Sequence, residues 1–161
     1  MTGMDTRILR QAMGNFCTGI VVVTGMERST PVGFTLQSFV SLSLAPPLIT
    51  ICPARASGSW SRIRATGAFA INILAHDQQD LCTAMARSGG DKFAGLTWSE
   101  GMGGLPILNG TIGHVICDLT AEHDGGDHTI VVGAIRTLGI TNPDKRPLLF
   151  FRGGYGGFEE T

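Results

Sequence analysis

Residues 111–140 read TIGHVICDLTAEHDGGDHTIVVGAIRTLGI, and this stretch predicts a long β-hairpin. Two runs rich in β-branched residues, 111–123 and 128–140, flank the tip sequence DGGD at 124–127. Asp-Gly and Gly-Gly between such runs are strong turn signals, because glycine adopts the positive φ of a tight hairpin turn. The stretch therefore indicates a protein built on antiparallel strands.

The rest of the chain repeats the pattern of strand following strand, which argues against a doubly wound α/β fold. Further strands are predicted at 19–24, 32–40, 48–52, 69–74 and 147–152. Helices are predicted at 5–16 with Asp5 as N-cap, at 59–65, and after Asp77 as N-cap. Pro46-Pro47 marks a bend, and residues 89–106 are predicted to form a long loop. Residues 1–161 are predicted to form one mainly β domain with peripheral helices.

Composition excludes several classes of function. The chain has 161 residues, 43% hydrophobic and 16% charged, with a net charge of −1. This balance rules out a disordered chain, and no basic stripe for nucleic acid or apolar run of membrane-spanning length is present. The low charge fraction instead favours burial of surface in a homodimer. No signal-peptide pattern is found at the N-terminus, which predicts a cytoplasmic protein.

The cysteines and the common motifs give further exclusions. Cys17, Cys52, Cys82 and Cys117 are widely spaced and form no CxxC pair, so we interpret them as buried free thiols. The sequence contains no GxGxxG after a strand, no Walker sequence and no GxSxG elbow. A nicotinamide cofactor held by a Rossmann domain and a serine hydrolase are therefore not indicated.

Polar residues interrupt the predicted strand at 32–40. Phe34, Thr35, Gln37 and Ser38 mix ring, hydroxyl and amide groups within an otherwise apolar run. One interpretation is that the hydroxyls bond to neighbouring backbone. The other is a polar rim around a flat heteroaromatic ligand, whose alternating donors and acceptors suit such groups.

Residues 52–60, CPARASGSW, place two serines and an arginine where a strand gives way to a helix. Hydroxyls, a guanidinium and free backbone N–H groups make an anion site. An ordinary serine N-cap beside a solvated Arg55 explains the same residues. Lys92, in the long loop, either adds positive charge to that site or is solvated.

Two more segments have open interpretations. The segment from His123 to His128 around the hairpin tip has three interpretations: it binds a metal, it forms a plain turn, or it provides His128 for an enzymatic role. Arg152-Gly153-Gly154-Tyr155 is a flexible tail, or backbone packed against a ligand on which Tyr155 stacks.

Taken together, these segments resemble one family, the short-chain flavin reductases of two-component flavin-dependent monooxygenases. The chain is especially similar to reductase partners of actinobacterial aromatic and steroid hydroxylases. Many relatives have Ser-Ser where this chain has Gln37-Ser38. The matching stretches, in the family's order, are 16–20, 33–35, 37–39, 44–48, 57–60, 69–74, 91–95, 126–128 and 152–155.

The resemblance implies a six-stranded FMN-binding split β-barrel that forms a homodimer with flavin near the subunit interface. It implies that NADH or NADPH reduces FMN or FAD, which then diffuses to a separate oxygenase of aromatic or steroid metabolism. The protein would position both molecules, with no catalytic acid or base and no metal. The implied flavin-site residues are Phe34, Thr35, Gln37, Ser38, Cys52, Pro53, Ala54, Arg55, Ser57, Ser59, Lys92 and Phe93. The implied nicotinamide-site residues are His128, Arg152 and Tyr155.

Three other hypotheses compete with this one. They are a non-catalytic flavin carrier, an oxidase of the pyridoxamine phosphate type with a similar barrel, and a purely structural dimeric β-barrel. The Gly126-Asp127-His128 and Arg152–Tyr155 segments favour the reductase, because a carrier needs no nicotinamide site.

Overall fold

A computed structural model describes residues 3–161. The helices are α1 (Thr6–Met13), α2 (Gly58–Arg64), α3 (Gln79–Ala86) and the 3-10 turn η1 (Met102–Gly104). The first six strands are β1 (Thr18–Gly19), β2 (Val21–Glu27), β3 (Thr30–Leu36), β4 (Phe39–Leu44), β5 (Pro47–Ile51) and β6 (Ala68–Ile73). The others are β7 (Trp98–Glu100), β8 (Pro106–Leu108), β9 (Gly113–Gly125), β10 (His128–Ile140), β11 (Leu148–Phe151) and β12 (Gly154–Gly157).

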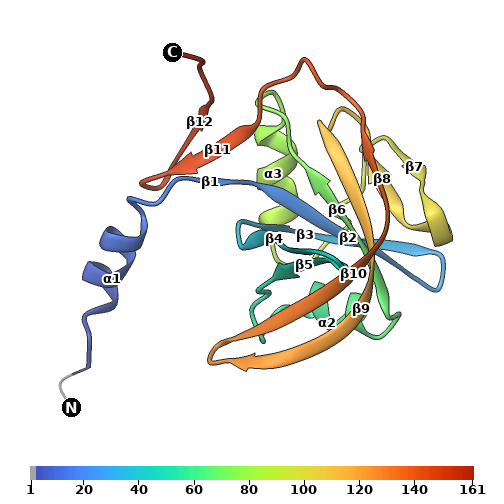
Figure 1. Ribbon diagram of the computed structural model, residues 1–161, viewed down its shortest axis with the longest axis horizontal. Helices are drawn as coiled ribbons and strands as arrows, with labels where there is room; N and C mark the ends of the chain where they lie inside the picture. The colour runs from blue at the N-terminus through green and yellow to red at the C-terminus, as the bar shows by residue number, and fades with distance from the viewer. Residues whose placement is uncertain (1–2) are drawn as a thin grey trace.

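The main sheet has seven antiparallel strands in the order β3-β2-β6-β9-β10-β5-β4 (Figure 1). The β9–β10 hairpin lies near its middle, and each of its strands has 13 residues. Gly126 at the tip has φ +77°, as the turn signal predicted. The mainly β class with peripheral helices is thus confirmed, whereas the main sheet has seven strands instead of the expected six. A three-stranded sheet, β1-β11-β12, and the β7-β8 pair complete the described strands.

Several local predictions were wrong. The predicted strand 32–40 breaks at Gln37-Ser38, where the Phe39 N–H donates to the Gln37 carbonyl and the chain turns from β3 into β4. Asp77 does not cap α3, because its carboxylate accepts from Lys145 Nζ at 2.7 Å and Gln78 holds the cap position. The glycine-rich tail forms β12 on β11, and the loop at 89–106 contains β7 and η1.

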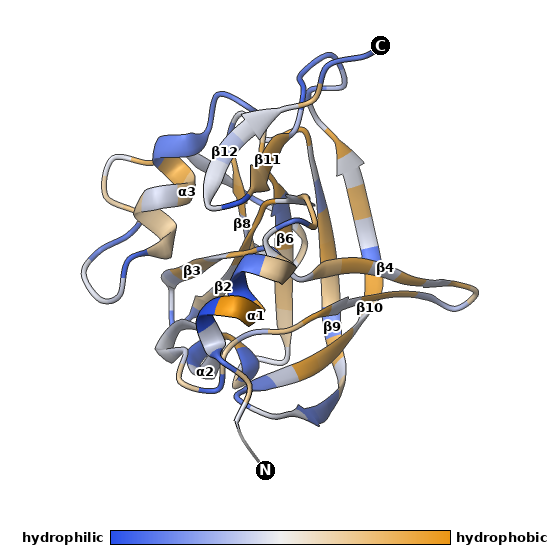
Figure 2. Ribbon diagram, turned by 90° about the vertical axis from the view of Figure 1, so that its left-hand side faces the viewer, coloured by the Kyte–Doolittle hydropathy of each residue, from blue (hydrophilic) through white to orange (hydrophobic). Residues whose placement is uncertain are grey.

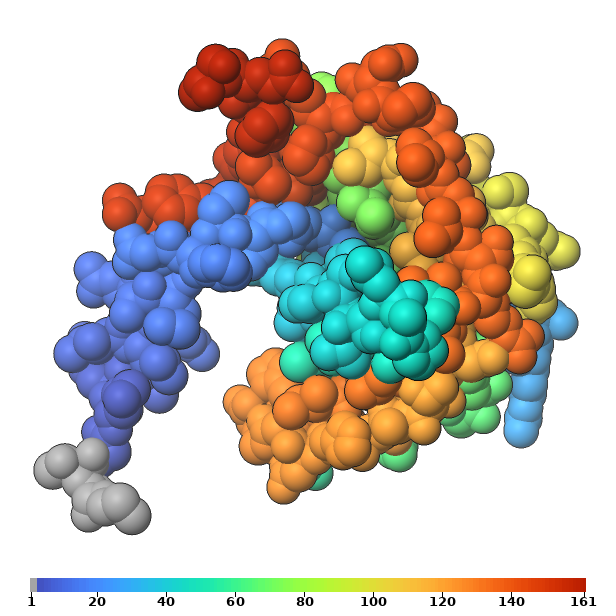
Figure 3. Space-filling model, in the orientation of Figure 1, coloured from blue at the N-terminus to red at the C-terminus, as the bar shows by residue number. Residues whose placement is uncertain are grey.

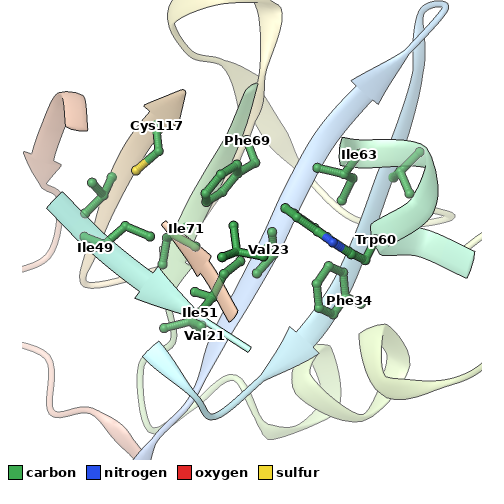
Figure 4. Packing of buried hydrophobic residues seen from close by; sticks show 13 residues of the cluster. Val21, Val23, Phe34, Ile49, Ile51, Trp60, Ile63, Phe69, Ile71 and Cys117 are labelled. Atoms are coloured by element: carbon green, nitrogen blue, oxygen red, sulfur yellow. The ribbon is translucent and has the colours of Figure 1, made fainter. Parts of the chain in front are cut away.

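The core lies between the main sheet and α2. Trp60 is 3% exposed and packs edge-on against Phe34 and Phe69, with ring centroids 6.4 Å and 5.7 Å away (Figure 4). Ser57 caps α2 by accepting from the Trp60 N–H at 3.1 Å, which fixes where this ring enters the core. The cap and the burial of Trp60 together hold residues 57–59 against the sheet edge.

A second region, the N-terminal arm at residues 5–19, is built differently. Asp5 caps α1 as predicted, but α1 has no buried residue and projects away from the sheet (Figures 1 and 3). Its apolar residues Ile8, Leu9 and Met13 form an exposed stripe, and Phe16, just after the helix, is 78% exposed. Figure 2 shows that α1 carries both hydrophobic and hydrophilic residues. Arg152 ties the arm to β11 through hydrogen bonds to Gly14 and Asn15.

The four cysteines are free, and only part of the expectation for them is correct. Cys82 and Cys117 are buried, Cys52 is half-buried, and Cys17 in the N-terminal arm is exposed. Burial raises the pKa of Cys117 to about 12. None of the helices in residues 3–161 has the length and apolar character that crossing a bilayer requires.

Candidate functional site

An open cavity of about 1230 Å³ runs along β3 and beneath α2 and α3. Its volume exceeds the roughly 300–1,000 Å³ typical of a pocket for one drug-sized ligand. Eleven of the predicted site residues line it: Phe34, Thr35, Gln37, Ser38, Cys52, Ala54, Ser57, Ser59, Lys92, His128 and Tyr155. Segments far apart in the sequence therefore meet at one site.

Gln37 and Ser38, in the turn between β3 and β4, line the cavity. Ser38 Oγ accepts from the Cys52 N–H at 3.0 Å and lies 3.2 Å from the Cys52 carbonyl oxygen. The Gln37 side-chain oxygen accepts from Thr18 Oγ1 at 3.2 Å, which links this turn to the N-terminal arm. The polar residues thus bond to neighbouring groups and line the cavity as well, so the two interpretations of this segment do not exclude each other.

Lys92 lines the cavity and contacts three oxygen atoms. Its Nζ lies 3.2 Å from the Gly33 carbonyl oxygen, 3.1 Å from the Met85 carbonyl oxygen and 3.4 Å from Ser59 Oγ. Partial burial lowers the pKa of Lys92. The ammonium group therefore joins β3, the end of α3 and the start of α2 at one point on the cavity wall.

His128 enters the cavity from the hairpin tip. Its Nδ1 lies 2.7 Å from the Asp127 carboxylate, and the hydrogen bond with His128 lowers the pKa of Asp127. The tip is fastened to residues 53–55 by the Arg55 N–H to the Asp127 carbonyl and the Thr129 N–H to the Pro53 carbonyl. This backbone pairing fixes His128 beside Ala54.

Tyr155 lines the cavity from the tail. Its ring packs edge-on against Phe150 at 5.3 Å, and its hydroxyl oxygen lies 3.6 Å from Cys82 Sγ. The contact with Cys82 raises the pKa of Tyr155. The tail is therefore an ordered strand against α3, and the flexible-tail interpretation is wrong for residues 154–157.

Four predicted site residues are outside the cavity lining. Arg55 pairs with Asp124, and Arg152 bonds to Asn15 with its guanidinium 4.9 Å from the Phe151 ring centroid. Phe93 is buried against Trp98, and the carbonyl of Pro53 is used by the hairpin tip. In this structure these contacts are thus with neighbouring residues outside the cavity lining.

Other lining residues were missed by sequence reasoning. Among them are Thr30, Pro31 and Val32 at the start of β3, Arg62 on α2, and the segment 87–91 after α3. Gly89 and Gly90 both have φ +74°, and this consecutive glycine pair was the signal available in the sequence. Among residues 3–161, no group of three His, Cys, Asp or Glu side chains is placed to hold a metal ion.

The lining suits a flat ring carrying a polar, charged chain. Apolar residues such as Ile20 and Met85 alternate with hydroxyls, an amide, an ammonium group and exposed backbone. The cavity between the sheet edge and two helices therefore suits the binding of a nucleotide-like aromatic molecule.

Comparison with known proteins identifies the family. The model of the flavin reductase like domain matches residues 13–159, so the chain belongs to this family. The reductase subunit HsaB of a flavin-dependent monooxygenase from Rhodococcus jostii is 44% identical over 156 residues, covering 97% of this chain and 80% of that protein.

Solved structures of similar proteins support the same family. The crystal structure of nitrilotriacetate monooxygenase component B from Mycobacterium thermoresistibile is 44% identical, with a TM-score of 0.93 over 96% of this chain and 87% of the other. The NADH:FAD oxidoreductase SgcE6 of Streptomyces globisporus, solved with NAD and FAD fragments, is 34% identical, with a TM-score of 0.90 over 96% and 93%. The prediction of a flavin reductase that uses a flavin and a nicotinamide cofactor is therefore confirmed at the level of the family.

Proposed function

We propose that this protein uses NADH or NADPH to reduce FMN or FAD, and that the reduced flavin serves a separate monooxygenase component. The observation that carries the proposal is the single cavity shared by the predicted flavin residues and by His128 and Tyr155. The names of the relatives, a reductase subunit and an NADH:FAD oxidoreductase, support it. An oxygenase of aromatic or steroid metabolism is the proposed recipient.

The residues at the β3–β4 turn would hold the ring of the flavin. When bound, the flavin supplies the redox chemistry, accepting a hydride from the nicotinamide. Ser38 and Thr35 are already oriented by the carbonyls of Cys52 and Cys82, so their hydroxyls are fixed before a ligand arrives. Such preorganised polar groups bind without further ordering cost.

Ser59 and Lys92 would hold the phosphate that follows the ribityl chain. Both groups lie on the cavity wall within 3.4 Å of each other, and each can turn a donor toward an anion. Ser57 lines the same stretch but its oxygen caps α2, so Ser59 is the better test of this role. Arg55 and Phe93 would act by supporting the wall.

His128 would contact the nicotinamide cofactor, positioned by Asp127 and by the pairing of the hairpin tip with residues 53–55. Tyr155 would also contact the nicotinamide cofactor, and Arg152 would act by holding the N-terminal arm against β11. In this proposal the protein orients the two molecules and excludes water, and no side chain transfers a proton in the hydride step.

We further propose that two copies associate as a homodimer with the split β-barrel arrangement that the family resemblance implies. Exposed apolar residues occur on the stripe of the N-terminal arm, on β4 and at the end of β10, where Leu44 is 88% and Ile140 77% exposed. Burying these surfaces against a second copy is favourable. The four free thiols support a reducing compartment, the cytoplasm.

Oxidation of NADH, followed at 340 nm with and without added flavin, tests the main proposal. Flavin-dependent turnover is expected. A protein that binds flavin but gives no turnover with NADH or NADPH would instead be a flavin carrier.

Two variants test the residue roles. His128→Ala should raise the KM for NADH more than the KM for flavin, and equal effects would remove His128 from the nicotinamide site. Ser59→Ala should weaken FMN far more than riboflavin, which lacks the phosphate. Ser61→Ala is the matched control, because Ser61 is exposed on the same helix and does not line the cavity.

A further inference from the structure

One row of residues across the small three-stranded sheet joins the N-terminal arm to the cavity lining. Thr18 on β1 pairs with Phe150 on β11, and Phe150 pairs with Tyr155 on β12. Residues that are directly paired in an antiparallel sheet place their side chains on the same face. Phe150 and Tyr155 line the cavity, whereas Thr18 is outside the lining. The row therefore places Thr18 next to residues that a ligand in the cavity would touch.

The backbone on both sides of this row fixes the position of Thr18. The next residue, Gly19, pairs with Leu149, and the Ile20 carbonyl accepts from the Leu74 N–H at 3.1 Å. Thr18 is half-buried, and its branching at Cβ restricts its rotamers. The place of the Thr18 hydroxyl is thus determined by strand pairing and does not depend on the hydrogen bond that it makes.

That hydroxyl donates to the side chain of Gln37, with Thr18 Oγ1 3.2 Å from Gln37 Oε1. Gln37 is exposed and lines the cavity. The oxygen and the amino group of a carboxamide point apart, so a contact at the oxygen leaves both N–H donors on the other side. Within residues 3–161 these two donors have no hydrogen-bond partner.

The other polar side chains of this segment have already used their hydrogens. Thr35 Oγ1 donates to the Cys82 carbonyl at 2.6 Å, and Ser38 Oγ lies 3.2 Å from the Cys52 carbonyl oxygen. A hydroxyl has one hydrogen to donate, so neither group has a second one for a ligand. Between residues 34 and 38, Gln37 is therefore the side chain with donors left for a ligand in the cavity.

We propose that Thr18 is a positioning residue, which turns the Gln37 carboxamide so that its amino group donates to the polar half of the flavin ring. The inference rests on the proposed function, since that function assigns the ring to residues 34–38. The benzenoid half of the ring carries methyl groups, whereas the other half carries the acceptors. Reduction adds negative charge at the N1 and O2 side of that half, and a donor aimed there stabilises the reduced ring more than the oxidised one.

Binding of oxidised flavin and of dithionite-reduced flavin, measured anaerobically without NADH, tests the inference. The flavin used is FMN or FAD, whichever the unchanged protein binds more tightly. Thr18→Val keeps the branched shape and removes the hydroxyl. It should weaken the reduced form about threefold to tenfold, the range that one lost hydrogen bond gives, and the oxidised form about twofold or less.

Two further variants control this measurement. Thr18→Ser keeps the hydroxyl and should restore most of the lost affinity for reduced flavin. Thr120→Val is the matched control, because Thr120 is exposed on β9 outside the cavity lining and its hydroxyl donates to the Val132 carbonyl. It should leave the ratio of the two affinities unchanged.

Gln37→Ala and the double variant show whether Thr18 acts through Gln37. Gln37→Ala should lower the affinity for reduced flavin at least as much as Thr18→Val, and the double variant should be no weaker than Gln37→Ala. Equal weakening of both redox forms by Thr18→Val, or additive losses in the double variant, would overturn the positioning role. Absent NADH turnover in the unchanged protein would count against the reductase alone, while binding of neither flavin form would overturn both proposals.

Discussion

The core around Trp60 buries its apolar side chains, whereas the N-terminal arm at residues 5–19 exposes them. In the core, sheet and helix bury the same ring from several sides, whereas α1 exposes a complete apolar stripe. The core is complete within one chain, whereas the arm is the part that we expect to pack against a second copy in the proposed homodimer. The sequence of α1 is strongly amphipathic although none of its residues is buried, so the difference lies in what each element packs against.

Trp60→Ala should have the largest effect, because it leaves a cavity between Phe34 and Phe69. We expect a loss of about 3–5 kcal/mol in the free energy of unfolding, measured by urea denaturation. Trp98→Ala, at a half-buried ring outside this cluster, should cost clearly less. Equal losses would mean that the core is not centred on Trp60.

Asn72→Ala probes the polar part of the core. The buried Asn72 side chain donates to Thr24 Oγ1 at 3.0 Å and accepts from the Leu108 N–H at 2.8 Å. Removing it leaves buried groups without partners, which should cost about 1–3 kcal/mol in the same urea experiment. A neutral result would show that water replaces the amide.

Phe16→Ser tests the arm. Burying a phenylalanine in an interface contributes about 1.5–3 kcal/mol, so the dimer should dissociate at least about tenfold more easily in analytical ultracentrifugation. The free energy of unfolding of the monomer should change by less than about 0.5 kcal/mol. Gln11→Ser, on the same helix, is the control. An unchanged dissociation constant would exclude this stripe from the interface.

Asp77→Asn should have the smallest effect, since the Asp77–Lys145 pair is half-exposed. The hydrogen bond with Lys145 lowers the pKa of Asp77 below its ordinary value of 3.8. The pair therefore stabilises the fold above that pH, by less than about 1 kcal/mol, and the contribution is lost as the pH falls below it. The melting temperatures of the two proteins should differ slightly at pH 7 and draw together as the pH is lowered below 3.8, whereas a difference that does not shrink in acid would contradict this assignment.

Much of the fold could be predicted from local signals. The hairpin tip at 124–127 and the Asp5 cap are determined by residues close in sequence, and the structure confirms them. The serine N-cap, one of two interpretations of residues 52–60, is made by Ser57. The break at Gln37-Ser38 was missed because the residue types on both sides favour strands. Asp77 was misassigned because its partner Lys145 lies 68 residues away.

The candidate site, too, could be predicted only in part from the sequence. Residue types at 34–38 and 52–59 indicated a ligand, and the family resemblance indicated which. Local sequence could not show that Arg55 is taken by Asp124, or that Arg87 and Thr30 share a cavity with Ser59. Such placements depend on strand register and on the positions of α2 and α3, which only the assembled sheet determines.

The hydrogen bonds of Lys92 also bear on how this protein can change over generations. Two of its three acceptors are backbone carbonyls, of Gly33 and Met85, and these persist whatever side chain a mutation introduces. Only a change at Lys92 itself or at Ser59 removes a partner from the contact. A change of side chain at position 85 therefore leaves the backbone acceptor of Lys92 in place. Position 92, in contrast, should tolerate few other residue types.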